Sequence, residues 1–511
     1  MRFFLPLGLA ALLIAAGCSK DKDVEPPAAL LKFKGTLPIK KLWGDNVGGG
    51  KKQVKLRLGL GPAIADGVVF AASHKGEVLA VTLETGKQAW VKKLKLPLSA
   101  GPAAGSGMVI LGSSKGTVIA LDAVNGRERW RVHVNSELLS APAISEKVVV
   151  LRSVDGRLHG LDSASGKELW QVEQQVPRLS LRGTATPIIA KELAISGFDN
   201  GKVMAVSLTT GDTVWDTALA SPHGRTELDR LVDIDSAVRV VGDDVFAAGF
   251  QGRTAMMALD SGQIWWAHDM SSYRGLAADG EDLFVTQSDG AVVALHDRDG
   301  SELWRNEDIK RRGLSAPVET STAVAVADYQ GYLHWLDKKT GYLVARVRVS
   351  KFRVSTPPVA VDDTVVVLDD DGKMAAFRAD PAHAGTAVPA PKALPTKEQK
   401  KAAKAAAKEA AKAAKASAKA ADKAAAKPAA KPVAPPPVVP PAAPSSAPPA
   451  EPPAAPSSAP PAEPPAAPSS TPPAEPPAAP SSAPPAEPPA APSSSPPAEP
   501  PAAPAVPPTQ P

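Results

Sequence analysis

The sequence of 511 residues contains a single cysteine, Cys18, and only eight histidines, which are scattered along the chain. One cysteine excludes a disulfide framework and any metal site built from several cysteines. No HExxH, GxSxG or P-loop motif is present, so nothing indicates a zinc protease, a serine hydrolase or a nucleotide hydrolase. No cluster of Asp, Glu and Asn outside the turns is typical of a Ca²⁺ site. We therefore expect no cofactor, no metal and no catalytic residues.

Positive charge is concentrated in one part of the chain. The net charge is +5 for the whole sequence, +9 for residues 392–431 and −5 for residues 432–511, which leaves +1 for residues 1–391. A nearly neutral main body argues against nucleic-acid binding, because that function requires a basic surface.

A frame of two glycines ten residues apart, followed four residues later by a tryptophan, recurs along the chain. Gly156, Gly166 and Trp170 form one copy, and further complete copies begin at Gly76, Gly116, Gly201, Gly252 and Gly290. The copy that begins at Gly331 has Ala345 in place of the tryptophan, and an eighth copy begins at Gly372 and stops before its tryptophan. Successive copies start 38 to 51 residues apart. This period is typical of a four-stranded propeller blade.

We predict an all-β fold over residues 35–380, an eight-bladed β-propeller of four-stranded blades. The tryptophans are expected to pack between blades rather than to bind a cofactor. Residues 37–44 contain Trp43 in a fragment that resembles the tryptophan strands, with no repeat in front of it. We expect this segment to pair into the incomplete eighth blade, which would close the ring and remove an open sheet edge.

The N-terminus is predicted to be a lipoprotein signal over residues 1–17. Arg2 precedes an apolar run that is too short to span a membrane as an ordinary helix. The run ends in Ala15-Ala16-Gly17-Cys18, which resembles a bacterial lipobox although Ala15 replaces the more usual leucine. We expect Cys18 to be lipid-modified and residues 18–34 to form a polar tether. Ser19 favours sorting to the outer membrane, and a free catalytic thiol is the alternative interpretation of Cys18.

The composition changes after residue 380. A linker is expected at 381–395, and residues 396–427 consist mainly of alanine and lysine, with lysines every three or four residues. This pattern predicts a single solvated helix with a cationic stripe. Residues 428–511 are rich in Pro, Ala and Ser, with a glutamate every twelve residues, and are predicted to be polyproline II or disordered. The stripe suits peptidoglycan, lipid headgroups or an acidic partner, and equally a solvated spacer.

Two connections between repeats are longer than the others, at residues 171–200 and 216–251. They belong to neighbouring blades and are expected on the same face of the ring, where long loops often carry function. The candidate residues for binding a partner are Leu179, Leu181 and Arg182 in the first loop and Asp229, Asp233 and Asp235 in the second. Apolar side chains beside an arginine, opposite an acidic cluster, suit a protein-docking site. An internal Arg–Asp latch between blades is the alternative.

The repeat resembles that of pyrroloquinoline quinone dehydrogenases, but the long loops resemble the BamB family of outer-membrane assembly lipoproteins more specifically. The second resemblance covers residues 1 to about 380. It rests on LSLRG at 179–183, DNG at 199–201, TELDRL at 226–231 followed by Asp-Ile-Asp at 233–235, and SGQIW at 261–265. The chain departs from the family pattern at Ala15, at Ala345 and throughout the segment after residue 380.

The resemblance to the BamB family implies a non-enzymatic, eight-bladed scaffold. It implies a lipid anchor in the outer membrane, on the periplasmic side, and binding to the POTRA domains of BamA in the barrel-assembly (BAM) complex. It also implies help with the insertion of nascent outer-membrane proteins. By the same resemblance, the residues that contribute to binding are Leu179, Leu181, Arg182, Asp233 and Asp235. Two alternatives stay open, a quinone-dependent dehydrogenase and an envelope adaptor linked to peptidoglycan.

Overall fold

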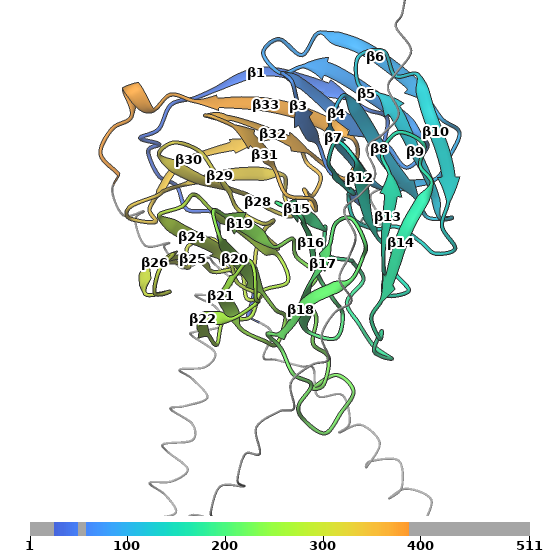
Figure 1. The fold of residues 1–511 in the computed structure, drawn as a ribbon. Coiled ribbons are helices and arrows are strands. Elements are labelled where there is room, and N and C mark those ends of the chain that lie inside the picture. The colour runs from blue at the N-terminus through green and yellow to red at the C-terminus, as the bar shows by residue number, and fades with distance from the viewer. Residues whose placement is uncertain (1–24, 50–57, 388–511) are drawn as a thin grey trace, which may run out of the picture. The chain divides into compact units, whose positions relative to one another are not determined.

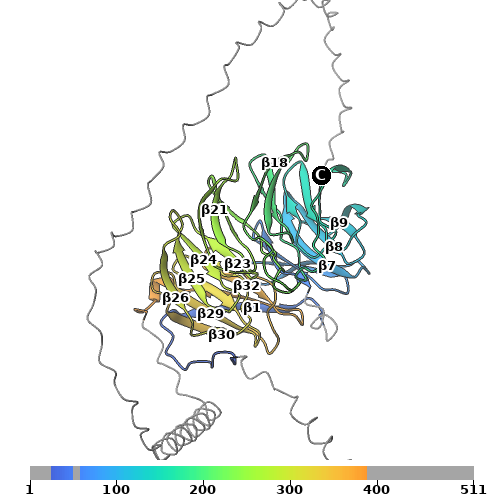
Figure 2. The same cartoon turned by 90° about the horizontal axis from the view of Figure 1, so that it is seen from below.

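The computed structural model describes residues 25–49 and 58–387. These residues form eight antiparallel sheets that are arranged in a ring, as Figures 1 and 2 show from two directions. The predicted eight-bladed propeller is therefore confirmed. The predicted signal, Cys18, the lysine-rich helix and the proline-rich repeats lie outside the described residues. Within the described residues, no helix is long and apolar enough to cross a membrane.

The first four blades follow one another along the chain, each written from its inner to its outer strand. Blade 1 comprises β3 (Ala63–Ala65), β4 (Val68–Ala72), β5 (Glu77–Thr82) and β6 (Gln88–Lys93). Blade 2 comprises β7 (Leu98–Gly105), β8 (Met108–Ser113), β9 (Thr117–Asp122) and β10 (Glu128–His133), with β2 (Gly59–Leu60) added in parallel to β7. Blade 3 comprises β11 (Ala143–Ile144), β12 (Val148–Arg152), β13 (Arg157–Asp162) and β14 (Glu168–Glu173). Blade 4 comprises β15 (Ile188–Ala190), β16 (Leu193–Gly197), β17 (Lys202–Ser207) and β18 (Thr213–Ala218).

The remaining blades complete the ring. Blade 5 comprises β19 (Arg239–Val241), β20 (Asp244–Ala248), β21 (Thr254–Ala258) and β22 (Ile264–His268). Blade 6 comprises β23 (Gly275–Ala278), β24 (Asp282–Thr286), β25 (Val292–His296) and β26 (Glu302–Asn306). Blade 7 comprises β27 (Val318–Glu319), β28 (Ala323–Ala327), β29 (Tyr332–Asp337) and β30 (Leu343–Arg348). Blade 8 comprises β31 (Val359–Val361), β32 (Thr364–Leu368), β33 (Lys373–Ala379) and β1 (Ile39–Asn46), and a short 3-10 helix, η1 (Pro381–His383), follows β33.

The hydrophobic core is divided among the junctions between blades. Eight clusters of buried side chains occur, and each joins two neighbouring blades. The two central strands of a blade supply much of each cluster; for example, all five residues of β12 are buried. One blade alone would leave these surfaces exposed, so burial of the apolar surface stabilises the ring rather than any single blade.

The repeated glycine and tryptophan form a contact between blades. Trp130 Nε1 donates a hydrogen bond to the carbonyl oxygen of Ser163 in the next blade, at 2.8 Å. The Trp130 ring lies against Gly166, where a Cβ atom would come within 2.7 Å of it. The same contact recurs in the pairs Trp43–Gly86, Trp90–Gly126, Trp170–Gly211, Trp215–Gly262, Trp266–Gly300 and Trp304–Gly341. The second glycine of the frame is therefore required because the neighbouring indole occupies the space of a side chain.

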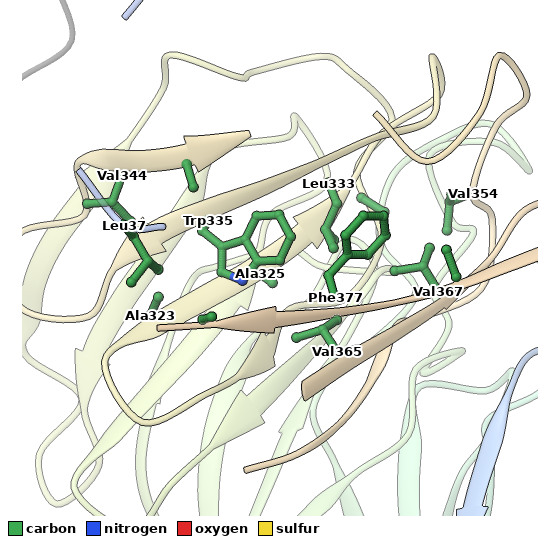
Figure 3. Close-up of a cluster of buried hydrophobic side chains, with 14 residues drawn as sticks. Leu37, Ala323, Ala325, Leu333, Trp335, Val344, Val354, Val365, Val367 and Phe377 are labelled. Carbon is green, nitrogen blue, oxygen red and sulfur yellow. The ribbon is translucent and has the colours of Figure 1, made fainter. Parts of the chain in front are cut away.

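The junction between blades 7 and 8 uses a different tryptophan. Ala345 on β30 stands directly opposite Trp335 on β29, whereas the other blades place a tryptophan on the outer strand, as with Trp170 opposite Gly160. The Trp335 side chain is fully buried and meets Phe377 of blade 8 edge to face, with ring centroids 6.3 Å apart (Figure 3). In blade 7 the tryptophan therefore lies on β29, whereas in the other blades it lies on the outer strand. Its Nε1 finds no hydrogen-bond partner among the described residues.

The N-terminal strand closes the ring as predicted. β1 pairs antiparallel with β33, from Ile39 opposite Ala379 to Asn46 opposite Lys373. Trp43 stands opposite Ala376 and donates a hydrogen bond from Nε1 to the carbonyl oxygen of Leu83 in blade 1, at 2.6 Å. Trp43 therefore supplies the tryptophan that the eighth repeat lacks.

Residues 25–37, which precede β1, lie against the ring. Arg312 Nη1 donates to the carbonyl oxygen of Ala28 at 2.9 Å, and Arg346 Nη2 donates to that of Leu31 at 2.7 Å. Closer to β1, the backbone N–H groups of Thr36 and Leu37 both donate to the carbonyl oxygen of Val344. The described part of the predicted tether is thus held along the outer strand of blade 7, because two arginines bind its backbone carbonyls.

Candidate protein-docking site

The strand order places the two long loops on one face of the ring. Strands alternate in direction within each blade, so every connection from an outer strand to the next inner strand emerges on the same side, together with the turns between the two central strands. We call this side the loop face. The connections that follow β14 and β18 both lie on it, at consecutive junctions, as predicted.

The first loop presents some predicted side chains to solvent and fixes its own backbone. Leu179 is 42% exposed, and Leu181 is half-buried. The backbone N–H of Leu181 donates a hydrogen bond to Asp233 Oδ2 at 3.0 Å. The Arg182 side chain is exposed, and its nearest acidic partner is Glu137, with Arg182 Nη2 at 3.8 Å from Glu137 Oε1. The loop therefore displays Leu179 and Arg182 on a backbone that Asp233 holds.

The second loop has an exposed tip and a buried base. Residues 221–230 are all exposed, and Leu228 is 69% exposed. Within this tip, Asp229 Oδ2 accepts a hydrogen bond from the Thr226 N–H and Thr226 Oγ1 accepts one from the Asp229 N–H, each at 3.1 Å. Asp229 therefore stabilises its own turn. Its carboxylate lies on the surface and does not join the other two predicted aspartates in the interior.

Asp233 and Asp235 lie at the base of the second loop, between blades 4 and 5. Asp233 is only 2% exposed, and its carbonyl oxygen accepts a hydrogen bond from the Phe250 N–H at 2.7 Å. Asp235 lies directly against Gly183 of the first loop, where a Cβ atom would come within 2.1 Å of Asp235 Oδ1. A side chain at position 183 would therefore push the two loops apart.

Two residues at this site were not predicted from the sequence, Arg152 and Asp199. The Arg152 guanidinium is fully buried, with Nη2 at 3.0 Å from Asp199 Oδ1 and Cζ at 4.4 Å from the centre of the Phe198 ring. It also donates a short hydrogen bond to the carbonyl oxygen of Ser153. An Arg–Asp latch between neighbouring blades does exist, but its arginine is Arg152 rather than Arg182. Arg152 ends an apolar strand and did not stand out in the sequence, whereas Asp199 lies in a turn and was noted there only as part of the DNG motif, without a role.

We call Arg152, Asp199, Asp233 and Asp235 the acidic cluster, since these three carboxyl groups all attract the buried Arg152, as does the less buried Asp155. Burial, together with the charges of Asp235 and Asp199, raises the pKa of Asp233 to about 8. Burial and the charge of Asp199 raise the pKa of Asp235 to about 6. Burial lowers the pKa of Arg152. The pKa values of both aspartates at the base of the two long loops are therefore shifted toward neutral pH. Neither this cluster nor any other group of three or more His, Cys, Asp or Glu side chains among the described residues is arranged to hold a metal ion.

Comparisons with known proteins agree with this architecture. A family model described as "Outer membrane protein assembly factor BamB" matches residues 74–306 and 288–385. The protein of that description from Pseudomonas aeruginosa is 47% identical over 370 residues, which cover 72% of this chain and 97% of that protein. The crystal structure of BamB from Moraxella catarrhalis superposes with a TM-score of 0.61 at 27% identity, covering 67% of this chain and all of that one.

A redox enzyme shares the fold. Quinohemoprotein alcohol dehydrogenase from Comamonas testosteroni superposes with a TM-score of 0.54, covering 70% of this chain and 78% of that one. Its sequence identity to this chain is only 12%, so the likeness concerns the fold alone.

Proposed function

Because this chain belongs to the BamB family of outer membrane protein assembly factors, we propose that its ring is a non-enzymatic scaffold that docks a periplasmic domain of the assembly machinery. The observation that carries the proposal is the pair of loops on the loop face. Their exposed side chains, Leu179 and Arg182, are held in place from below by the hydrogen bond between Asp233 and Leu181. A preorganised apolar anchor beside a cation is what a compact protein interface requires.

The proposed partner is the POTRA region of BamA within the BAM complex. Leu179 supplies an apolar contact, Arg182 supplies a charge that can pair with a carboxylate, and Asp229 adds an exposed charge of opposite sign. Asp233 is almost fully buried, so it acts by positioning the first loop. Asp235 acts in the same way through its contact with Gly183. The scaffold then assists the insertion of nascent barrel proteins into the outer membrane.

We further propose that lipid on Cys18 anchors the chain to the outer membrane on its periplasmic side. The course of the described N-terminal segment supports this arrangement. The Ala28 N–H donates to the carbonyl oxygen of Lys310, in the connection from blade 6 to blade 7, which lies on the loop face. The segment thus reaches the ring on the same face as the docking loops. The lysine-rich segment 396–427 is proposed as a spacer that can meet peptidoglycan.

A dehydrogenase is the less favoured alternative. The likeness to the quinohemoprotein enzyme does not support it, because a shared propeller fold says nothing about a shared site. An envelope adaptor linked to peptidoglycan is the second alternative. It differs in placing the function in residues 396–511 rather than on the loop face, so it predicts that those residues are captured with peptidoglycan while the ring binds no assembly component.

The proposal is tested by capture of partners from detergent-solubilised envelopes. We expect the wild-type chain to recover the barrel-assembly core, and Leu179→Ala and Arg182→Ala each to lower recovery about 5- to 30-fold, the effect of losing about 1–2 kcal/mol at a central contact. Leu169→Ala is the matched control, since Leu169 is 50% exposed on β14 of blade 3 but lies outside the loops. Failure of the wild-type chain to recover any assembly component would overturn the proposal.

A further inference from the structure

The inner strands of the ring and the connections that lead into them surround an open cavity of about 540 Å³ on the ring axis. Its wall draws on most of the blades and includes Leu181 and Arg182 of the first docking loop. A cavity of this size can hold a small organic ligand, for which the usual range is roughly 300–1,000 Å³. The docking proposal gives this cavity no role.

The wall of the cavity is strongly cationic. Four arginines contribute to it, from different parts of the ring, and Asp235 is the one acidic residue among the described residues that line it. The arginines are Arg182, Arg239, Arg274 and Arg353. This excess of positive charge contrasts with the nearly neutral ring as a whole, and a charged cavity with protein walls concentrates ions of the opposite sign.

Arg239 is a partly buried cation without a direct partner. It begins β19, the inner strand of blade 5. Among the described residues, its guanidinium makes no hydrogen bond and no ion pair. Burial lowers the pKa of Arg239, and the attraction of Glu319 only opposes this effect. Withdrawing a guanidinium from water without pairing it is costly, so an anion that reached Arg239 would be bound favourably.

Two further groups in the wall have free hydrogen-bonding capacity. The Arg274 guanidinium stacks on the Tyr273 ring, with Cζ at 4.6 Å from the ring centre, and donates no hydrogen bond to any described residue. Ser236 is 7% exposed, and its buried hydroxyl oxygen has no hydrogen-bond partner in the described part of the chain. Both residues line the same cavity as Arg239. Asp235, in the same wall, attracts the Arg274 guanidinium, but no hydrogen bond to a described residue uses the donors of that guanidinium. A buried hydroxyl and two guanidinium groups with free donors indicate a site built for an acceptor.

We propose that the axial cavity binds a small anion that carries at least two carboxylate or phosphate groups. Guanidinium groups pair with either kind of anion through two parallel hydrogen bonds. Arg239 and Arg274 belong to consecutive blades, which suits a ligand with two separate anionic groups. The Ser236 hydroxyl donates a further hydrogen bond. This inference does not depend on the docking proposal, because it rests on Arg239, Arg274 and Ser236, none of which that proposal uses.

The test is titration calorimetry on the full chain, with citrate and pyrophosphate as separate probes at constant ionic strength. We expect at least one probe to bind, and Arg239→Gln and Arg274→Gln each to weaken its binding at least about tenfold. Binding of citrate alone assigns carboxylates, and binding of pyrophosphate alone assigns phosphates. The lysine-rich segment is unchanged in every variant, so its contribution to binding is constant.

Two controls keep the outcome decisive. Arg298→Gln removes an exposed arginine from a turn on the face opposite to the loop face, and should leave binding unchanged. Ser236→Ala removes only a hydroxyl and is expected to fold even if an arginine variant does not; it should weaken binding about threefold to tenfold. The proposal is wrong if neither probe binds the wild-type chain, or if binding persists unchanged in the correctly folded variants of Arg239, Arg274 and Ser236.

Discussion

Two clusters of buried charge lie in different blades, and their charge balance is opposite. The acidic cluster at blades 3 to 5 sets three carboxyl groups against Arg152. The second cluster lies in blade 7 and the connection before it. There, Asp328 Oδ2 lies 2.7 Å from Arg312 Nη2 and 3.1 Å from His334 Nε2, and Arg346 lies nearby. We call Arg312, Asp328, His334 and Arg346 the basic cluster. All the side chains of the Arg312–Asp328–His334 group are nearly inaccessible to solvent.

Each cluster has more groups of one kind, carboxyl or guanidinium, than it has partners for them. These surplus groups form hydrogen bonds to a segment of backbone. Carboxylates only accept hydrogen bonds and guanidinium groups only donate them. The surplus acceptor Asp233 therefore takes a backbone N–H, that of Leu181 in the docking loop. In the basic cluster, Arg312 and Arg346 donate to the backbone carbonyls of Ala28 and Leu31. Whether the surplus group is a carboxyl or a guanidinium thus decides which kind of backbone group a buried cluster can hold.

The clusters also differ in their response to pH. In the basic cluster, burial acts to raise the pKa of Asp328, but the hydrogen bond and the charge of His334, together with Arg312, lower it overall. Asp328 therefore stays ionised at neutral pH. In the acidic cluster, the pKa values of Asp233 and Asp235 are raised to about 8 and about 6. The docking loop should respond to pH, and the N-terminal segment should not.

The largest effect is expected from breaking one ion pair in each cluster. Arg152→Ala and Asp328→Ala should each lower the free energy of unfolding by about 3–5 kcal/mol at pH 8, because each leaves buried charge without a partner. At pH 5 the loss should be smaller for Arg152→Ala, since the raised pKa values let the remaining carboxyl groups take up protons. Denaturant unfolding at both pH values measures this. If the loss in free energy of unfolding changed with pH to the same extent in both variants, the two clusters would not differ in their response to pH.

A smaller effect is expected from releasing the N-terminal segment. Arg346→Met removes the hydrogen bond to Leu31 and the contact with the Phe33 ring, whose centre is 5.3 Å from Arg346 Cζ. The loss of a charged hydrogen bond of about 1.5–3 kcal/mol should speed amide exchange in residues 28–37 by about 10- to 100-fold. Arg348→Met is the control, since Arg348 is exposed on the same strand and contacts Ser350 and the Tyr332 ring, but makes no hydrogen bond to the described residues of the N-terminal segment. Similar exchange in both variants would contradict a role for Arg346.

The smallest effect concerns pH and Asp233. A raised carboxyl pKa stabilises the fold below the ordinary value, and this stabilisation is lost as the pH rises through about 8. Asp233→Asn still offers an acceptor to Leu181 but cannot ionise. Between pH 7 and pH 8.5 it should lose about 1–2 kcal/mol less stability than the wild type. Thermal unfolding over this range checks the expectation, and Asp229→Asn, on the exposed tip, should behave like the wild type.

Much of the fold could be predicted because the residues that define the repeat are also the residues that contact each other between blades. The glycine and tryptophan of the frame touch across every junction except that of blades 7 and 8, so their spacing encoded the packing between blades. The exchange of Ala345 and Trp335 could not be predicted, since it depends on which residues face each other across β29 and β30. Periodicity within one strand says nothing about its partner's register.

The candidate docking site could be predicted only in outline. The length of the two loops indicated their importance, and the structure brings their bases together. The separation of exposed Asp229 from buried Asp233 was not visible, because both lie in the same polar stretch. Arg152 was missed for the opposite reason, since it follows a run of apolar residues in a central strand. Burial of charge is decided by contacts between blades, which no local pattern reports.

The pairing of β1 with β33 sets the order in which the molecule can be completed. β1 and its partner strand β33 lie roughly 340 residues apart in the chain, and a contact of such long range is slow to form because a long loop must close first. Until it forms, the first and last blades each have an unpaired neighbour surface. A ring closed by its two ends therefore cannot mature blade by blade from the N-terminus. A chain that ends before β33 therefore leaves β1, with Trp43, without its partner strand.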